Sequence, residues 1–194
     1  MSEKDEKDEI IFGAGELYLN EFTGNTIPED EEIETPDFNV GHCSGGFSVD
    51  YKPEKYNVEN QYGKIVRSYV IKEEIVAQTG ILSWDLNKLA LLSTAKISVD
   101  KENKKKILEF GGSNPTIKTV LLRFVHTKEN GKKLRFTMIG QGGNGFAIEF
   151  TTKELTVDAQ ITAIEYIKGF LARIDEELTD DEVSALPEST KEGA

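Results

Sequence analysis

Two long β-patterned runs, residues 46–59 and 64–82, constrain the fold of this chain more than any other feature. A short segment at residues 60–63, which contains Asn60 and Gly63, joins them and has the composition of a tight turn. Both runs alternate polar with apolar residues, as strands do when their two faces differ. The sequence therefore predicts one long β-hairpin.

The alternation along this hairpin is broken in both runs. Phe47 and Tyr51 share one face of the first run, but Tyr56 falls on the opposite parity, so we expect a β-bulge near Pro53. In the second run, valines interrupt the otherwise polar face at Val66, Val70 and Val76. A sheet face that is half apolar indicates contact with something beyond the protein's own core.

Shorter strands and one helix account for the rest of the folded region. Apolar residues recur at helical spacing after Ser83, which predicts a helix over residues 83–93 with Ser83 as its cap. Strand patterns occur at residues 10–22, 96–99, 106–110, 117–127, 134–139, 146–151, 156–167 and 170–174. No other helix separates successive strands, so the βαβ alternation of a parallel sheet is missing. The predicted fold class is mainly β: an antiparallel β-sandwich or barrel with a long β-hairpin and one flanking α-helix.

The domain organisation follows from charge and apolar content. Residues 1–9 are nearly all charged and cannot bury enough apolar surface to offset the entropy lost on ordering, so we expect a disordered acidic tail. The β-sandwich domain is expected over residues 10–178, with a long loop at 23–45 of the kind that often has a function. Residues 179–194 are expected to form a flexible C-terminal tail.

Within that tail, Thr179 and Glu182 have the spacing of a capping box. A short helix starting there could extend through Ala185, and Pro187 would end it.

The charge balance opposes tight binding to DNA or to an anionic membrane. The chain has 35 acidic and 23 basic residues, a formal net charge of −12, whereas phosphate binding needs clustered cations. No apolar run approaches the ~20 residues that span a bilayer, and the first residues lack the pattern of a secretory signal. With Cys43 as its single cysteine, the chain forms no internal disulfide, so we expect a soluble protein in a reducing environment.

Motifs that resemble chemical sites each have a simpler explanation. Residues 140–145 fit G-x-G-x-x-G, but the next residues alternate like a strand, whereas a dinucleotide site needs a helix there. His42 adjoins Cys43, yet neighbouring side chains of an extended chain point to opposite faces. The acidic run at 29–34 lacks the ligand spacing of a calcium loop. We assign no catalytic, cofactor-binding or metal-binding residue, and we expect no enzyme activity.

The order of a strand at 13–19, the hairpin at 46–82, the helix at 83–93 and closing strands to residue 174 resembles phage tail tube proteins. The likeness extends to local sequence, as where residues 68–74 (SYVIKEE) lead into residues 80–87 (GILSWDLN). The family has no short diagnostic motif, so no residue role is transferred from it. The resemblance implies a β-sandwich, flanked by a helix, that forms hexameric rings; the rings stack into a tube through which DNA passes.

On this resemblance we expect a structural subunit of the virion tail, assembled in the cytoplasm of the host bacterium. Its partners would be copies of itself and other phage tail proteins, with DNA passing through the lumen without tight binding. The negative charge fits such a conduit, because a wall that bound phosphate tightly would stall the DNA. A ligand-binding or capsid-decorating β-sandwich module, which would not stack, is the alternative. An enzyme with a polar pocket is the third class.

The polar face of the hairpin supplies the candidate functional residues. If one parity packs on the core, the other faces the tube interior, a neighbouring subunit or solvent. The candidates for a lumen-facing position are Ser48, Asp50, Lys52, Glu54, Ser68, Lys72, Glu74 and Gln78.

Overall fold

The computed structural model describes residues 14–41, 43–81, 84–111, 115–142, 145–148 and 157–185. Every strand pairing in this part of the chain is antiparallel. This confirms the mainly β, antiparallel fold class. Predictions made above on residues 1–9 and His42, and on most of residues 179–194, concern residues outside those described.

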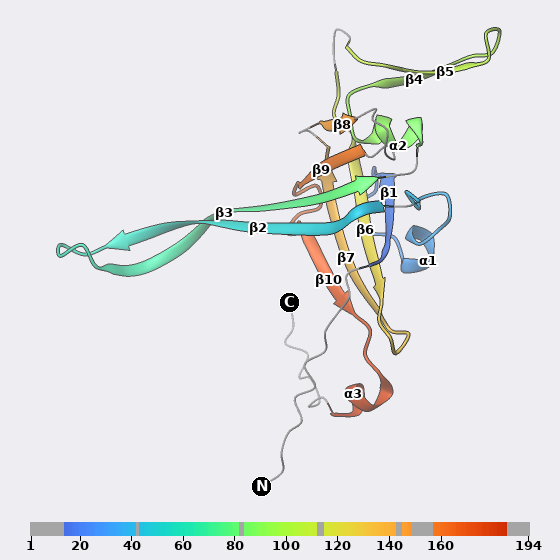
Figure 1. Ribbon diagram of the computed structural model, residues 1–194. Helices are drawn as coiled ribbons and strands as arrows, with labels where there is room; N and C mark the ends of the chain where they lie inside the picture. Colours follow the sequence, from blue (N-terminus) through green and yellow to red (C-terminus); the bar gives the residue numbers. More distant parts are fainter. Residues whose placement is uncertain are drawn as a thin grey trace.

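One bent sheet forms the body of the protein. Its strands are β1 (Glu16–Glu21), β2 (Cys43–Glu59), β3 (Ile65–Ile81), β6 (Thr119–Thr127), β7 (Lys133–Gln141), β8 (Phe146–Ile148), β9 (Val157–Ala163) and β10 (Ala172–Glu176). They are arranged in the order β1-β6-β7-β9-β3-β2, with β10 also paired to β7 and β8 to β9. Strands β2 and β3 run across the direction of β6 and β7 (Figure 1), which gives the sandwich-like layering.

Strands β4 (Lys96–Asp100) and β5 (Lys105–Glu109) form a separate two-stranded sheet that projects from the body and that we call the β4–β5 arm (Figure 1). The helices are all short: α1 (Asp30–Ile33), α2 (Leu86–Leu91) and α3 (Asp180–Ala185). The capping box predicted before α3 is present. Glu182 Oε2 accepts hydrogen bonds from the backbone N–H of Thr179 at 2.6 Å and from its hydroxyl at 2.8 Å.

The predicted helix after the hairpin exists, but its cap and its bounds were wrong. The N-cap is Asp85, whose carboxylate accepts from the backbone N–H of Asn87 at 2.9 Å, and α2 ends at Leu91. Helical periodicity locates an apolar stripe but does not distinguish Ser83 from Asp85 as the residue that caps it, since both side chains suit that role.

Lys88 links α2 to β1 and to the loop that follows β1. Its buried ammonium donates to the backbone carbonyls of Leu19 at 3.1 Å and Asp37 at 2.9 Å. Burial lowers the pKa of Lys88, because the charged form loses solvation.

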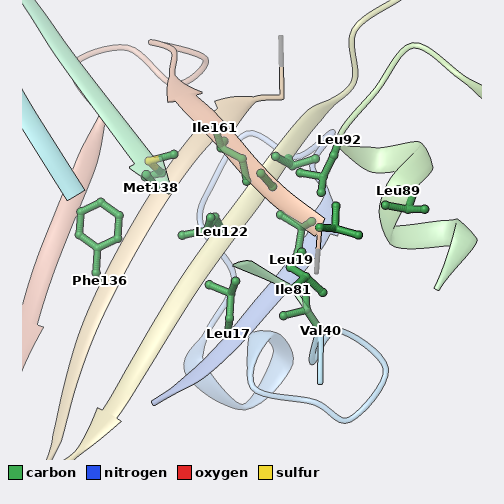
Figure 2. Close-up of a cluster of buried hydrophobic side chains, with 14 residues drawn as sticks. Leu17, Leu19, Val40, Ile81, Leu89, Leu92, Leu122, Phe136, Met138 and Ile161 are labelled. Carbon is green, nitrogen blue, oxygen red and sulfur yellow. The ribbon is translucent and has the colours of Figure 1, made fainter. Parts of the chain in front are cut away.

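The main core lies where β3 and β9 cross the β1-β6-β7 part of the sheet (Figure 2). It contains side chains from five strands and from α2, among them Leu17, Leu19, Ile81, Leu89, Leu92, Leu122, Phe136, Met138 and Ile161. The inward-facing residues of each strand alternate with others, as expected for a layered antiparallel fold. The core joins residues as far apart in the sequence as Leu17 and Ile161.

The long loop after β1 covers the opposite face of the same sheet. Phe22 and Ile33 pack with Leu121, Val125 and Ile139 into a second buried cluster. The end of the loop also pairs with β1, where Leu19 N–H donates to the Phe38 carbonyl at 2.8 Å and Val40 N–H to the Leu17 carbonyl at 2.9 Å. The loop is therefore a packed part of the domain.

An ion-pair network centred on two buried arginines holds this loop in place. Arg123 is fully buried; its Nε donates to Thr137 Oγ1 at 2.9 Å and its Nη1 pairs with Asp30. Arg135 donates from Nε to Glu34 at 2.5 Å and from Nη1 to Glu177 at 2.6 Å. The network thus joins α1, β6, β7 and the segment after β10.

The neighbouring cations lower the pKa values of the three acidic residues in this network. Burial opposes the charge on Glu34, but hydrogen bonds from Arg135 and Lys133 outweigh it and lower the pKa of Glu34. The pKa of Asp30 is lowered in the same way, since its hydrogen bond with Arg123 outweighs burial. Hydrogen bonds from Arg135 and the Lys133 backbone lower the pKa of Glu177.

Glu34→Gln should destabilise the fold, because it removes the charge that compensates buried Arg135. We expect the free energy of unfolding, measured by chemical denaturation, to fall by about 2 to 4 kcal/mol. Glu31→Gln, on the exposed side of α1, is the matched control and should stay within about 0.5 kcal/mol of the parent protein. Equal losses in the two variants would contradict this role for the network.

The stability of the fold should decrease at acidic pH, because the same carboxylates become protonated. Because the folded-state pKa values of Asp30, Glu34 and Glu177 lie below their unfolded values, the unfolded chain binds protons first as the pH falls. Their contribution is complete above about pH 5 and is lost below the ordinary carboxyl range near pH 4. Melting temperatures measured between pH 7 and pH 3 should decline more steeply for the parent protein than for Glu34→Gln. Parallel curves would contradict the prediction.

Candidate functional site

The β2–β3 hairpin extends well away from the body of the protein (Figure 1). Each of its strands has 17 residues, but only residues 76–81 of β3 also pair with β9. The predicted turn is present: Asn60 N–H donates to the Lys64 carbonyl at 2.9 Å, and Gly63 has a φ of 69°, which favours glycine. We call residues 55–71, beyond the pairing of Glu54 with Lys72, the distal hairpin.

The β2–β3 pairing has three register shifts, and the one closest to the bulge expected near Pro53 lies in the other strand. Glu54 pairs with Lys72 and Lys55 pairs with Val70, so the additional residue is Ile71 in β3 and not a residue near Pro53 in β2. Because β2 continues its alternation without interruption, Tyr56 lies on the face that carries polar side chains nearer the body. In the distal hairpin, apolar side chains consequently occupy both faces.

Most of the candidate polar residues form one row on a single face of the hairpin. In the register, Ser48 lies opposite Gln78, Lys52 opposite Glu74 and Glu54 opposite Lys72, while Asp50 lies opposite Val76. Ser68 does not belong to this row: it pairs with Asn57 beyond the register break and donates to its side chain at 2.8 Å, on the other face. The prediction that Ser68 shares the face of the others was wrong, since it assumed unbroken alternation in β3.

The contacts within this row are weak and open to solvent. Lys72 Nζ lies 3.3 Å from Glu74, Lys52 Nζ lies 4.0 Å from Asp50, and Gln78 donates to Asp50 at 3.5 Å. Exposed pairs of this kind contribute ~0 to 1 kcal/mol each. The row is therefore not needed for folding and is available for contacts outside the subunit.

Large apolar side chains are exposed along the hairpin. They are Val49, Tyr51, Tyr56, Val58, Tyr62, Ile65, Val66, Tyr69, Val70 and Ile71. Tyr62, at the turn, is the most exposed of them at 77%. Exposed apolar side chains concentrated in this way on one projecting element mark an interaction site.

Strand β2 is also an edge strand, the last in the order of the sheet. Among the described residues no strand pairs with its outer side, so a row of backbone N–H and C=O groups is free to bond with another chain. Lys52, Pro53 and Lys55 lie on this edge, and such residues limit uncontrolled pairing.

The glycine-rich turn at residues 140–145 has a packing explanation. A Cβ on Gly140 would lie 2.6 Å from the Thr162 carbonyl oxygen, and one on Gly142 would lie 2.6 Å from that of Leu92. The strand predicted after the turn is present as β8, starting at Phe146. Gly143 and Asn144 lie outside the described residues.

Metal-ligand clusters, histidines that face a cavity and membrane-spanning helices would each indicate a function for the described residues. No group of three or more His, Cys, Asp or Glu residues among them could hold a metal ion. His126, one of two histidines in the chain, is buried and contacts the Ala14 carbonyl through Nδ1 at 2.6 Å. No helix in the described ranges is long and apolar enough to cross a membrane.

Sequence reasoning missed the ion-pair network beneath the loop. A signal for it exists: Arg123 lies within the apolar run of residues 120–125, and Arg135 lies in the partner strand. A charged residue in the middle of a buried strand requires an acidic partner from elsewhere in the fold. The acidic run at residues 29–34 could have been proposed as that partner.

Comparison with known proteins gives no relative: no protein-family model matches the chain, and a search of curated proteins finds no match.

Proposed function

We propose that this protein is a structural subunit that self-assembles into hexameric rings, which stack as the tail tube of a phage and form a conduit for DNA. The observation that carries the proposal is the projecting hairpin, with apolar side chains on both faces of its distal part. The ring, its number of copies and the stacking come from the resemblance to tail tube proteins. The subunit would be assembled in the host cytoplasm and would contact other tail proteins in the virion.

Burial of its exposed apolar side chains against another subunit would stabilise the hairpin. A two-stranded hairpin alone is marginal in water, and this one extends beyond the strands that support its base. Burying a side chain such as Ile65 or Tyr69 against another subunit would contribute ~1.5 to 3 kcal/mol each. Several such contacts are sufficient to order the distal hairpin within an assembly.

The arrangement of the sheet favours copies of the same chain as that partner. Its two edge strands, β1 and β2, lie at opposite ends of the strand order. When two different surfaces of identical subunits bind each other, the subunits form a closed ring if the rotation from one subunit to the next is a whole fraction of a full turn. Closure removes the exposed edge of β2, which otherwise promotes uncontrolled aggregation.

We also propose that the polar row faces the lumen of the tube. Its carboxylates are Asp50, Glu54 and Glu74, and its cations are Lys52 and Lys72. The acids exceed the bases by one, so repetition around a ring gives a wall of net negative charge that repels phosphate. DNA would pass such a wall without being retained.

The parent protein should self-associate into rings or tubes as its concentration rises, measured by light scattering and electron microscopy. A variant in which Asn-Gly replaces residues 55–71, so that a two-residue turn connects Glu54 to Lys72, should fold and remain monomeric, because it lacks the apolar distal hairpin. The control shortens the β4–β5 arm by replacing residues 100–105 with Asn-Gly. A parent protein that stays monomeric at every concentration, also with tail-initiating proteins present, would contradict the proposal and favour the ligand-binding or capsid-decorating module.

Reversing two charges in the polar row tests the lumen assignment. Asp50→Lys with Glu54→Lys should change the free energy of unfolding by less than about 1 kcal/mol, because both side chains are exposed. Particles that contain the variant should assemble but deliver DNA more slowly, since the wall would then bind phosphate. Glu102→Lys with Glu109→Lys in the β4–β5 arm is the charge-matched control. Delivery at the normal rate by the first variant would show that these side chains do not line the channel.

A further inference from the structure

A pocket of about 410 Å³ lies between β1 and the loop that follows it. Its lining includes the apolar side chains of Phe22, Ile33, Phe38 and Leu121 and the carboxylates of Glu21 and Glu32. Phe22, Ile33 and Leu121 belong to the second buried cluster, so the pocket has a rigid floor. Pockets of this volume accept groups larger than a single aromatic side chain.

Two acidic residues in the lining, Glu21 and Glu32, give this pocket a negative charge. Glu21 pairs with Lys118 at 3.7 Å, whereas Glu32 is exposed and has no ion-pair partner among the described residues. Glu29 and Glu31 flank it on the outer side of the loop and are exposed as well. A cationic group that approached the pocket would meet a favourable potential.

The tip of the hairpin has the complementary properties. Tyr62 is exposed, and the Asn60 side chain holds its backbone by accepting from the N–H groups of Tyr62 at 3.0 Å and Lys64 at 3.1 Å. The distal hairpin contains three cations, Lys55, Lys64 and Arg67, against one acid, Glu59, for a net charge of +2 on a chain of −12. The exposed Tyr62 ring, two residues from Lys64, therefore lies on a net basic segment of an otherwise acidic protein.

The tip and the pocket lie on opposite sides of the subunit. The hairpin leaves the body on one side, and β1, α1 and the loop that form the pocket lie on the other (Figure 1). The tip of one subunit therefore meets the pocket only of another copy. Such a contact joins two different surfaces and repeats from one copy to the next.

We infer that the pocket between β1 and the loop receives the hairpin tip of a second copy, with the Tyr62 ring in the apolar pocket and the Lys64 ammonium beside Glu32. This inference rests on the proposed self-assembly and identifies the surface that receives the hairpin. Apolar burial supplies the affinity, since a tyrosine in a desolvated pocket is a typical interface anchor. The charge pair fixes the orientation and speeds the encounter.

Crosslinking tests the contact directly. Full-length protein with benzoylphenylalanine in place of Tyr62 is mixed with ¹⁵N-labelled parent protein, irradiated under assembly conditions and analysed by mass spectrometry. We expect crosslinks from position 62 to residues 18–38, joining labelled to unlabelled peptides. Crosslinks that map to other segments, or only within one copy, would overturn the inference.

A charge swap provides an independent test in sedimentation experiments. Lys64→Glu and Glu32→Lys should each weaken association about fivefold or more, and the double variant should recover most of the parent affinity. Tyr62→Ser should weaken it about tenfold or more. Lys101→Glu and Val99→Ser, both exposed and both on the projecting β4–β5 arm (Figure 1), are the matched controls and should leave association unchanged.

The outcomes separate this inference from the proposed function. If the parent protein never associates, both fail. A second outcome is that the parent protein associates, while each single variant associates as tightly as the parent and the double variant recovers no affinity. That result would show that the hairpin tip does not bind this pocket, but it would leave the proposed self-assembly intact.

Discussion

The pairing of buried Arg123 and Arg135 with Asp30 and Glu34 is the interaction on which the rest of the structure depends. It holds the loop after β1 against the outer face of the sheet, so that two strand layers and a loop layer enclose two apolar clusters. Without these anions the two buried guanidinium groups would lack compensation in a setting that solvates charge poorly. The same pairing sets the position of α1 and hence the shape of the pocket beside it.

The two strands of the hairpin contribute to the core near the body and expose apolar surface further out. Near the body, β3 pairs with β9, and the inward face at Ala77 is buried in the main core. Before Val76 β3 has no pairing with β9, and beyond the register break at Ile71 apolar residues lie on both faces of the hairpin. The inner part therefore contributes to folding, and the distal hairpin carries surface that folding does not use.

Much of this architecture was predictable from local patterns. Asn60 and Gly63 identify the hairpin turn, and Asn130 with Gly131 identifies the turn between β6 and β7, because these residues favour backbone angles that others avoid. The strand that contains the bulge was not predictable: alternation reveals that the register breaks near residue 54, but either strand can supply the additional residue. The ion-pair network and the pocket depend on residues about 90 to 100 positions apart, such as Asp30 and Arg123, and no local pattern links them.

The location of the hairpin and the pocket at opposite edges of one sheet gives any assembly built through them a polarity. Where the contact joins one ring to the next, a growing tube has two unlike ends, one that presents free aromatic tips and one that presents free acidic pockets. Each end can then be recognised separately, so a protein that starts the assembly and a protein that stops it need different surfaces. An initiating partner would offer one half of the contact and a terminating partner the other, and neither would have to resemble the whole subunit.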